Sequence, residues 1–307
     1  MAGKSVNPKK CVYFCHVVWI KMSFMRPLVP YTINVHGRLL QLDKPKVMGI
    51  LNLSEESFYA SVSTPTREKV FSRVEKMLAE GTDMIDVGAC STRPGSTGVT
   101  VEEEMQALRM ALPIVRELAP ETVISVDTYR ADVATMCVEE YGVDVINDIS
   151  AGEMDARMFD TIARLRVPYV MMHMQGVPAT MQTNPQYNDV VDDVVTYLAR
   201  RAGELRDKGV ADVIVDPGFC FGKTLEHNYE LMLRLEELHL LEMPLLVGIS
   251  RKTMVYRLLG VTPEEALNGT TALNTVALMK GAHILRVHDV KACRQCIEIV
   301  DKLRDNS

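Results

Sequence analysis

The chain has 307 residues, of which 47% are hydrophobic and 24% are charged. This composition is ordinary for a globular protein, and the length suits one large domain or two small ones. The formal net charge of −6 excludes the global basic field of a nucleic-acid-binding protein. No apolar run reaches the roughly 18 residues that a membrane span needs, so neither nucleic acid nor membrane is an expected partner.

The seven cysteines are an odd, scattered set: Cys11, Cys15, Cys90, Cys137, Cys220, Cys293 and Cys296. Several lie inside strand or helix patterns, as reduced buried thiols do. This usage fits a reducing compartment better than a disulfide framework, and we expect a cytoplasmic protein. The Cys293-x-x-Cys296 spacing resembles a redox or metal pair, but it lies in a terminal amphipathic segment without a second pair to complete a zinc site.

Residues 1–30 are interpreted as a peripheral N-terminal extension that need not be ordered, and residues 31–307 as one domain. The apolar stretch 11–20 is the nearest approach to a signal sequence, yet no clear small-residue cleavage site follows it. Residues 31–42 predict a β-hairpin with His36-Gly37 at its turn.

From residue 46 onward, short β-branched runs alternate with longer segments of helical period. Strands are predicted at 46–53, 84–89, 122–127, 145–150, 168–174, 213–217, 245–250 and 284–288. Helices are predicted at 67–80, 101–118, 131–141, 155–165, 190–208, 225–239, 270–280 and 290–303. The strands are apolar almost throughout, which is typical of parallel strands buried on both faces.

This alternation predicts an α/β fold, specifically a (β/α)8 TIM barrel whose N-terminal hairpin plugs the bottom of the barrel. Gly81, Gly142, Gly209 and Gly281 stand where predicted helices stop before a strand. An open, doubly wound sheet is the rival interpretation of the same pattern.

Almost every predicted strand ends in a polar residue that can reach inward. These residues are Asn52, Ser91-Thr92-Arg93, Asp127, Asn147, His173, Asp216, Ser250-Arg251-Lys252, Arg286 and His288. Each alone has a plain explanation, such as a helix cap or a satisfied core histidine. Together they would share the face of a barrel on which enzymes of this fold keep their active sites.

The polar residues divide into two chemical groups. Arg93, Arg286 and His288 can surround an anion, and Asn52 offers an amide oxygen to a metal. The second group supplies acceptors and donors for a flat polar heterocycle. It consists of Asp127, Asn147, Asp216 and Lys252. The residues by themselves therefore predict a site for a phosphorylated heterocycle, without naming it.

Eight segments in order resemble the dihydropteroate synthases, a family of pterin-binding barrels. They are VMGILN (47–52), STRPGS (91–96), SVDTYR (125–130), INDIS (146–150), MMHMQG (171–176), DPGFCFGK (216–223), GISRK (248–252) and RVHDV (286–290). The similarity extends from about Tyr31 to the C-terminus. It implies a transferase that condenses 7,8-dihydropterin-6-ylmethyl diphosphate with 4-aminobenzoate, giving 7,8-dihydropteroate and diphosphate in folate biosynthesis.

The resemblance also implies roles for particular residues. The pterin would contact Asp127, Asn147, Met172, Asp216, Phe221 and Lys252. The diphosphate would contact Asn52, Arg93, Arg286 and His288, with Asn52 touching a Mg²⁺ cofactor. The aminobenzoate would contact Phe58, Thr92, Pro94 and Ser250. Asp127, Lys252 and Arg286 would carry catalysis, and the family resemblance further implies a homodimer and a sulfonamide target.

The loop after the first barrel strand departs from the family pattern. Residues 53–62 read LSEESFYASV, with Glu55 and Glu56 where the family has Pro and Asp, and without the usual glycines. A non-catalytic or altered pterin-binding paralogue is therefore an alternative hypothesis. A methyl-tetrahydrofolate methyltransferase is a third hypothesis. Arg93, Arg286 and His288 argue against it, because the substrate of that enzyme has no diphosphate for them to bind. Cys90 as a nucleophile lacks an identifiable base.

Overall fold

The computed structural model describes residues 25–53, 67–89 and 99–305. Eight parallel strands form one sheet: β3 (Lys46–Asn52), β4 (Met84–Gly88), β5 (Val123–Asp127), β6 (Val145–Asp148), β7 (Tyr169–Met172), β8 (Val213–Asp216), β9 (Leu246–Val247) and β10 (Ile284–Val287). Their order is β8-β7-β6-β5-β4-β3-β10-β9. A parallel bridge between Val215 and Leu245 joins the two outermost strands. The sheet therefore curls into a nearly closed barrel.

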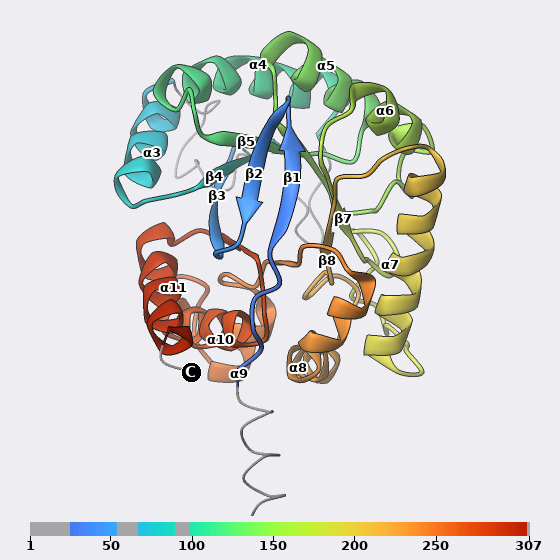
Figure 1. The fold of residues 1–307 in the computed structure, drawn as a ribbon, viewed down its shortest axis with the longest axis vertical. Helices are drawn as coiled ribbons and strands as arrows, with labels where there is room; N and C mark the ends of the chain where they lie inside the picture. Colours follow the sequence, from blue (N-terminus) through green and yellow to red (C-terminus); the bar gives the residue numbers. More distant parts are fainter. Residues whose placement is uncertain (1–24, 54–66, 90–98, 306–307) are drawn as a thin grey trace, which may run out of the picture.

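Helices occupy the connections and surround the strands (Figure 1). They are α3 (Arg67–Ala79), α4 (Val101–Leu118), α5 (Ala131–Tyr141), α6 (Met158–Leu165), α7 (Val190–Asp207), α8 (Leu225–Leu233), the 3₁₀ helix η1 (Leu235–Leu241), α9 (Thr253–Leu259), α10 (Leu267–Met279) and α11 (Val290–Arg304). The strands are buried on both faces, by the barrel interior on one side and by these helices on the other. This burial explains why their sequences are apolar rather than alternating.

The hairpin of β1 (Tyr31–Val35) and β2 (Arg38–Leu42) lies across one opening of the strand ring (Figure 1). Its buried side chains Ile33, Val35 and Leu42 form one apolar cluster with a residue from each barrel strand. Those eight residues are Met48, Met84, Val123, Val145, Val170, Ile214, Leu246 and Ile284. The hairpin and this layer together make an apolar floor at the N-terminal end of the strands.

The residues just before the hairpin are attached to the barrel. The backbone N–H of Arg26 donates to the carbonyl of Met279 at 2.8 Å, and the ring of His283 contacts the carbonyl of Val29 at 2.9 Å. The described part of the predicted N-terminal extension, residues 25–30, is thus docked, while residues 1–24 lie outside the described part of the chain.

The predicted (β/α)8 barrel with its N-terminal hairpin is confirmed, and the open doubly wound sheet is wrong. The segment predicted as one helix at 225–239 is divided into α8 and η1 at Arg234, whose guanidinium pairs with Glu230, Glu237 and Asp189. The short helix α9 was not predicted. Its seven residues are too few to show a clear period.

Cys293 and Cys296 are core residues of α11. Burial raises the pKa of the Cys293 thiol, and the Cys296 thiol faces the carbonyl of Thr271 at 3.7 Å. Within residues 25–53, 67–89 and 99–305, none of the helices combines the length and the apolar character needed to cross a bilayer.

Candidate active site

The polar groups lie one layer above the apolar floor. Side chains alternate between the two faces of a strand, so the residue two positions after a floor residue also points into the barrel. Met84, Val145, Ile214 and Ile284 of the floor are followed in this way by Asp86, Asn147, Asp216 and Arg286. The lining of the barrel interior therefore changes from apolar to polar over two residues along these strands.

Arg286 connects carboxylates of two strands. Its Nε donates to Asp86 Oδ2 at 2.6 Å and its Nη2 donates to Asp127 Oδ2 at 2.7 Å. Asn147 Nδ2 donates to the same Asp86 oxygen at 3.0 Å. β4, β5, β6 and β10 thereby contribute to one hydrogen-bonded group, although Asp86 and Arg286 stand 200 residues apart in the sequence.

A second group follows β8 and β9. Asp216 Oδ1 accepts the backbone N–H of Gly218 at 2.7 Å, and Lys252 Nζ donates to the carbonyl of Phe219 at 3.0 Å. Gly248 shows that the two groups share one space. A methyl group at that position would lie 3.7 Å from Lys252 Nζ, 3.9 Å from Asp216 Oδ2 and 3.7 Å from Arg286 Cβ. The absence of a side chain at Gly248 leaves room for a ligand among these charges.

An apolar wall borders the charged groups. Met172 and Phe221 belong to one buried cluster whose other members are Ile149, Met174 and Met181. Lys252 Nζ lies 4.7 Å from the centre of the Phe221 ring. A flat ring placed here would meet apolar surface on its face and charged groups at its edge, which is the arrangement that a polar heterocycle requires.

Burial sets the protonation behaviour of these groups. It raises the pKa of Asp127 to about 7, against the opposing charge of Arg286 and with support from Asp86. Burial alone would lower the pKa of Arg286, but the charges of Asp86 and Asp127 raise it above its usual value. Burial likewise raises the pKa of Asp216 and lowers that of Lys252, and each charge opposes the shift of the other. The site thus holds Arg286 as a fixed cation beside an acid that titrates near neutrality.

His288 is a neutral hydrogen-bond donor rather than a cation. Burial and the charge of Arg286 lower its pKa to about 4. Ser250 Oγ accepts the backbone N–H of His288 at 3.1 Å and lies 3.0 Å from His288 Nδ1. The hydroxyl has a proton and a second lone pair for this contact, so it can donate to Nδ1 or accept from it, according to the tautomer of the ring. In the tautomer with its proton on Nε2, the imidazole can donate to an anion from that nitrogen.

Lys223 is a second buried lysine beside the site. Its Nζ lies 2.9 Å from His173 Nδ1 and donates to the carbonyls of Gly218 and Phe221 at 2.9 and 3.2 Å. Burial lowers the pKa of Lys223 to about 7 and holds that of His173 well below its usual value. Lys223 thus ties the loop that follows Asp216 and carries Phe221 to the end of β7.

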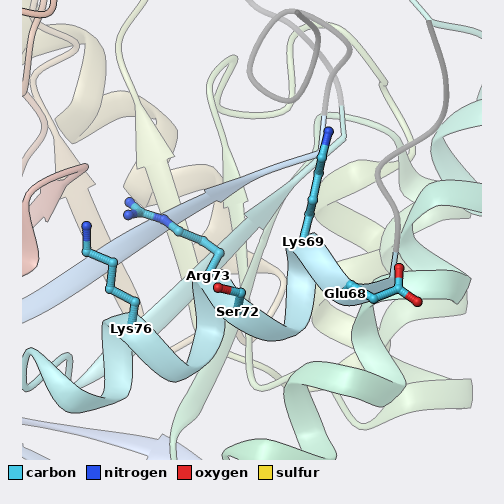
Figure 2. A pocket seen from close by; sticks show the side chains of 5 residues that line it. All are labelled: Glu68, Lys69, Ser72, Arg73 and Lys76. Atoms are coloured by element: carbon cyan, nitrogen blue, oxygen red, sulfur yellow. The ribbon is translucent and has the colours of Figure 1, made fainter. Parts of the chain in front are cut away.

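A surface pocket of about 460 Å³ lies along α3, lined by Glu68, Lys69, Ser72, Arg73 and Lys76 (Figure 2). Lys69, Arg73 and Lys76 project from the same side of the helix (Figure 2). Arg73 Nη2 donates to the backbone carbonyl of His288 at 2.7 Å. The pocket therefore adjoins the C-terminal end of β10 and adds positive charge to that side of the barrel.

Asn52 ends β3 and pairs in register with Gly88 of β4. Its side-chain amide oxygen is a hard ligand of the kind that Mg²⁺ accepts. The described residues contain no group of three or more His, Cys, Asp or Glu arranged to hold a metal. The donor set therefore fits a Mg²⁺ that is bound chiefly by the phosphate oxygens of a substrate, not one held in a protein cage.

The structure brings together many of the residues predicted from the sequence. Asp127, Asn147, Asp216, Lys252 and Arg286 share one end of the barrel, beside Met172 and Phe221. Ser250 contacts His288, so its predicted contact with an aminobenzoate carboxylate stays a prediction. Four further predicted residues, Phe58, Thr92, Arg93 and Pro94, lie outside the described residues.

Two buried residues were missed. Asp86 stands in the otherwise apolar strand Met84–Gly88, and a charged residue at the centre of such a strand is a signal that the sequence did contain. Lys223 follows Phe221 and Gly222 in the loop after β8. Nothing in its sequence context distinguishes it from a surface lysine, because its burial depends on contacts with β7.

The comparisons with known proteins agree with this geometry. A family model described as pterin binding enzyme matches residues 48–288. The dihydropteroate synthase of Escherichia coli (strain K12) is 42% identical over 270 residues, which cover 86% of this chain and 94% of that protein.

Solved structures of this enzyme superpose on the chain. The Yersinia pestis dihydropteroate synthase in a sulfonamide drug complex has a TM-score of 0.83 at 37% identity, covering 90% of this chain and 100% of that one. The Xanthomonas albilineans enzyme with 4-aminobenzoic acid has a TM-score of 0.81 at 35% identity, covering 90% of this chain and 99% of that one. The chain therefore belongs to the pterin-binding enzyme family, among the dihydropteroate synthases.

Proposed function

We propose that the chain condenses 7,8-dihydropterin-6-ylmethyl diphosphate with 4-aminobenzoate, releasing 7,8-dihydropteroate and diphosphate. The observation that carries the proposal is the convergence of Asp216, Lys252 and Arg286 on the space in front of Gly248, with Asp127 paired to Arg286. Family membership supports the reaction class, a transfer in folate biosynthesis.

The pterin would occupy the space between the apolar wall and the charged groups. Its ring N–H and amino groups would donate to Asp216 and Asn147, and Lys252 would donate to its carbonyl oxygen or a ring nitrogen. Met172 and Phe221 would cover a face of the ring. Matched donors and acceptors matter here because an unpaired polar group in a buried site costs about 1–3 kcal/mol.

The diphosphate would lie toward β10 and β3. Arg286 and the Nε2–H of His288 would donate to its oxygens, and Arg93 is expected to join them. Asn52 would contact a Mg²⁺ cofactor, which when bound supplies positive charge to the departing phosphate oxygens. Bond cleavage requires stabilisation of this developing negative charge, which such donors would provide.

Departure of the diphosphate leaves positive charge on the methylene carbon of the pterin. The ionised carboxylate of Asp127 would stabilise this charge, and the neutral amine of 4-aminobenzoate would then attack the carbon. No strong base is needed, because an aromatic amine is unprotonated at neutral pH. Exclusion of water from the site would prevent competing hydrolysis.

The aminobenzoate is assigned to Phe58, Thr92, Pro94 and Ser250, as the family resemblance predicts. The Xanthomonas albilineans relative is described with 4-aminobenzoic acid and the Yersinia pestis relative with a sulfonamide drug. We therefore expect a sulfonamide to compete with 4-aminobenzoate for this chain as well.

A turnover assay tests the proposal. The full chain with pterin diphosphate, 4-aminobenzoate and Mg²⁺ should form dihydropteroate and diphosphate in equal amounts, and EDTA should abolish the reaction until Mg²⁺ is restored. Lys252→Ala should lower kcat/KM by roughly 100-fold or more, because it removes a buried charged hydrogen bond. The exposed Lys291→Ala is the matched control and should be unchanged. Tight pterin binding with no turnover would instead favour the paralogue hypothesis.

We also propose a homodimer. Exposed leucines lie on α8, η1 and α9, namely Leu233, Leu240, Leu258 and Leu259. Burying such side chains between two copies is favourable. Light scattering on the purified chain should give twice the mass of 34.3 kDa. The cytoplasmic location stays a prediction from cysteine usage.

A further inference from the structure

Asp86 carries a buried charge that the fold does not need. It is fully buried in β4, and its register partners are Ile50 of β3 and Ser125 of β5. An apolar residue such as Ile50 thus fills the same layer on the neighbouring strand. Burying an ionised carboxylate is costly even beside a cation, so packed apolar residues in place of the whole group of Asp86, Asn147 and Arg286 would serve the fold at least as well. The carboxylate therefore indicates a role in the site.

One oxygen of Asp86 holds two groups. Its Oδ2 accepts from Asn147 Nδ2 at 3.0 Å and from Arg286 Nε at 2.6 Å. Its Oδ1 has no hydrogen-bond partner among the described residues. Asp86 therefore lies beneath the pterin-facing residues and acts through them, not by touching the ring itself.

The acceptor-only chemistry of a carboxylate determines how the amide of Asn147 is turned. An ionised carboxylate has no proton to donate, so the NH₂ of Asn147 must face it. The amide oxygen of Asn147 is then directed elsewhere. No described residue donates to this oxygen, and it is not among the fully buried unpartnered atoms. Asn147 thus presents an acceptor to the barrel mouth, where a pterin carries donors.

The same carboxylate orients Arg286. With Nε donating to Asp86 and Nη2 donating to Asp127, the plane of the guanidinium is held by carboxylates from two adjacent strands. A planar fork held at two of its nitrogens keeps one orientation. Asp86 therefore controls both the amide and the guanidinium that border the heterocycle.

From these contacts we infer that Asp86 is a positioning residue that sets the donor and acceptor pattern of the pterin pocket. Through Asn147 it makes the pocket select a heterocycle with an amino group at ring position 2 over one with an oxygen there. The inference rests on the proposed function, because it requires the pterin to bind against Asn147.

Asp86→Leu tests the inference, because leucine has the branched shape of aspartate without its oxygens. It removes the oxygen that accepts from both Asn147 and Arg286, so the amide of Asn147 is no longer held with its own oxygen toward the mouth. The affinity for 6-hydroxymethylpterin, measured by calorimetry, should fall by roughly 10- to 100-fold. The preference for this ligand over 6-hydroxymethyllumazine, which has oxygen at position 2, should shrink by about tenfold or more.

Asp86→Asn is the conservative variant. Its amide oxygen can take the place of Oδ2 and accept from both Asn147 and Arg286, while its NH₂ takes the place of Oδ1, which has no hydrogen-bond partner in the described part of the chain. We expect Asp86→Asn to bind 6-hydroxymethylpterin at least about tenfold more tightly than Asp86→Leu.

Ser125→Ala is the matched control. Ser125 is buried in the same layer, and its hydroxyl has no partner among the described residues. The affinity of Ser125→Ala for 6-hydroxymethylpterin and its preference for this ligand should stay within about twofold of the native values, because the substitution breaks no hydrogen bond with a described residue. Thermal unfolding of each variant shows whether a loss of affinity merely follows a loss of fold.

Two results would overturn the inference. One is an Asp86→Leu protein that loses affinity for both ligands equally, because a purely structural residue would act in this way. The other is an Asp86→Asn protein that binds no better than Asp86→Leu. If the native chain still forms dihydropteroate in either case, the proposed function stands; a native chain that binds no pterin overturns both.

Discussion

The protonation state of Asp127 links its surroundings to the reaction. Burial raises its pKa to about 7, with Arg286 opposing the rise and Asp86, Glu104 and Asp148 adding to it. A carboxylate can stabilise a cation only when it is ionised. The raised pKa therefore places the active form of the ligand-free protein at and above neutrality.

We predict that kcat/KM for the pterin diphosphate rises with pH and levels off above about 7, since this ratio reports the free enzyme. Asp127→Asn should show a much lower rate that does not change over the same pH range. A rise near pH 7 that persists in Asp127→Asn would assign the titration to another group, such as the diphosphate itself.

The same shift affects stability in the opposite sense. Between the unfolded pKa near 4 and the folded pKa near 7, the folded protein keeps a proton on Asp127 that the unfolded chain has lost. The contribution of Asp127 to the free energy of unfolding is therefore greatest below pH 4 and declines as the pH rises toward 7. Activity and stability thus respond oppositely to the ionisation of one side chain.

At the scale of the elements, the loop after β8 depends on close packing against β7. Gly218 has a φ of +70°, and a methyl group there would lie 1.8 Å from the carbonyl oxygen of His173. Lys223 closes the loop through the carbonyls of Gly218 and Phe221. A residue with a side chain at 218 would separate the loop, and with it Phe221, from the end of β7.

Gly218→Ala should lower the free energy of unfolding by about 3 kcal/mol or more, the sum of a left-handed backbone penalty and a steric clash. Gly260→Ala is the control, because Gly260 has a φ of +65° with nothing within 4 Å of the added carbon. It should cost only about 1–2 kcal/mol. Equal losses in urea unfolding would show that the contact with His173 is unimportant.

The hairpin is expected to stabilise the barrel from below. Leu42 is fully buried in the apolar floor, whereas Leu39 of the same strand is 62% exposed. Leu42→Ala should lower the free energy of unfolding by about 2–5 kcal/mol, and Leu39→Ala by less than about 0.5 kcal/mol. Similar values for the two variants, measured by chemical denaturation, would mean that the hairpin contributes little to the barrel.

Most elements could be predicted because their signals are local. The bounds of α4 and α5 and of the hairpin strands agree with the predicted ranges, since the apolar period of each lies within the segment and Gly142 marks the end of α5. The division at Arg234 and the short helix α9 could not be predicted. Arg234 pairs with Asp189, which comes from a distant helix end, and such contacts do not show in a local pattern.

The whole molecule determines the site, and the sequence shows only part of it. Polar residues at strand ends were visible, and Asp127, Asn147, Asp216 and Lys252 were predicted in this way. Their pairings were not, because the ion pair of Arg286 with Asp86 requires the closed order of the strands. The contact of His288 with Ser250 likewise joins residues that stand 38 positions apart in the chain.

The barrel architecture explains why distant residues form one site. The floor takes one side chain from every strand, which fixes the strands relative to one another. The next layer then brings carboxylates, an amide and a guanidinium into contact at the other end. A rigid scaffold of this kind holds charged groups in place before a ligand arrives, as electrostatic catalysis requires.

The central claim is that these groups form one pterin pocket in front of Gly248. A crystal structure of the chain with bound 6-hydroxymethylpterin tests it most directly. The account predicts the ring edge against Asn147, Asp216 and Lys252, with its face on the apolar wall of Met172 and Phe221. A pterin bound away from these residues, or one whose donors face Lys252, would contradict it.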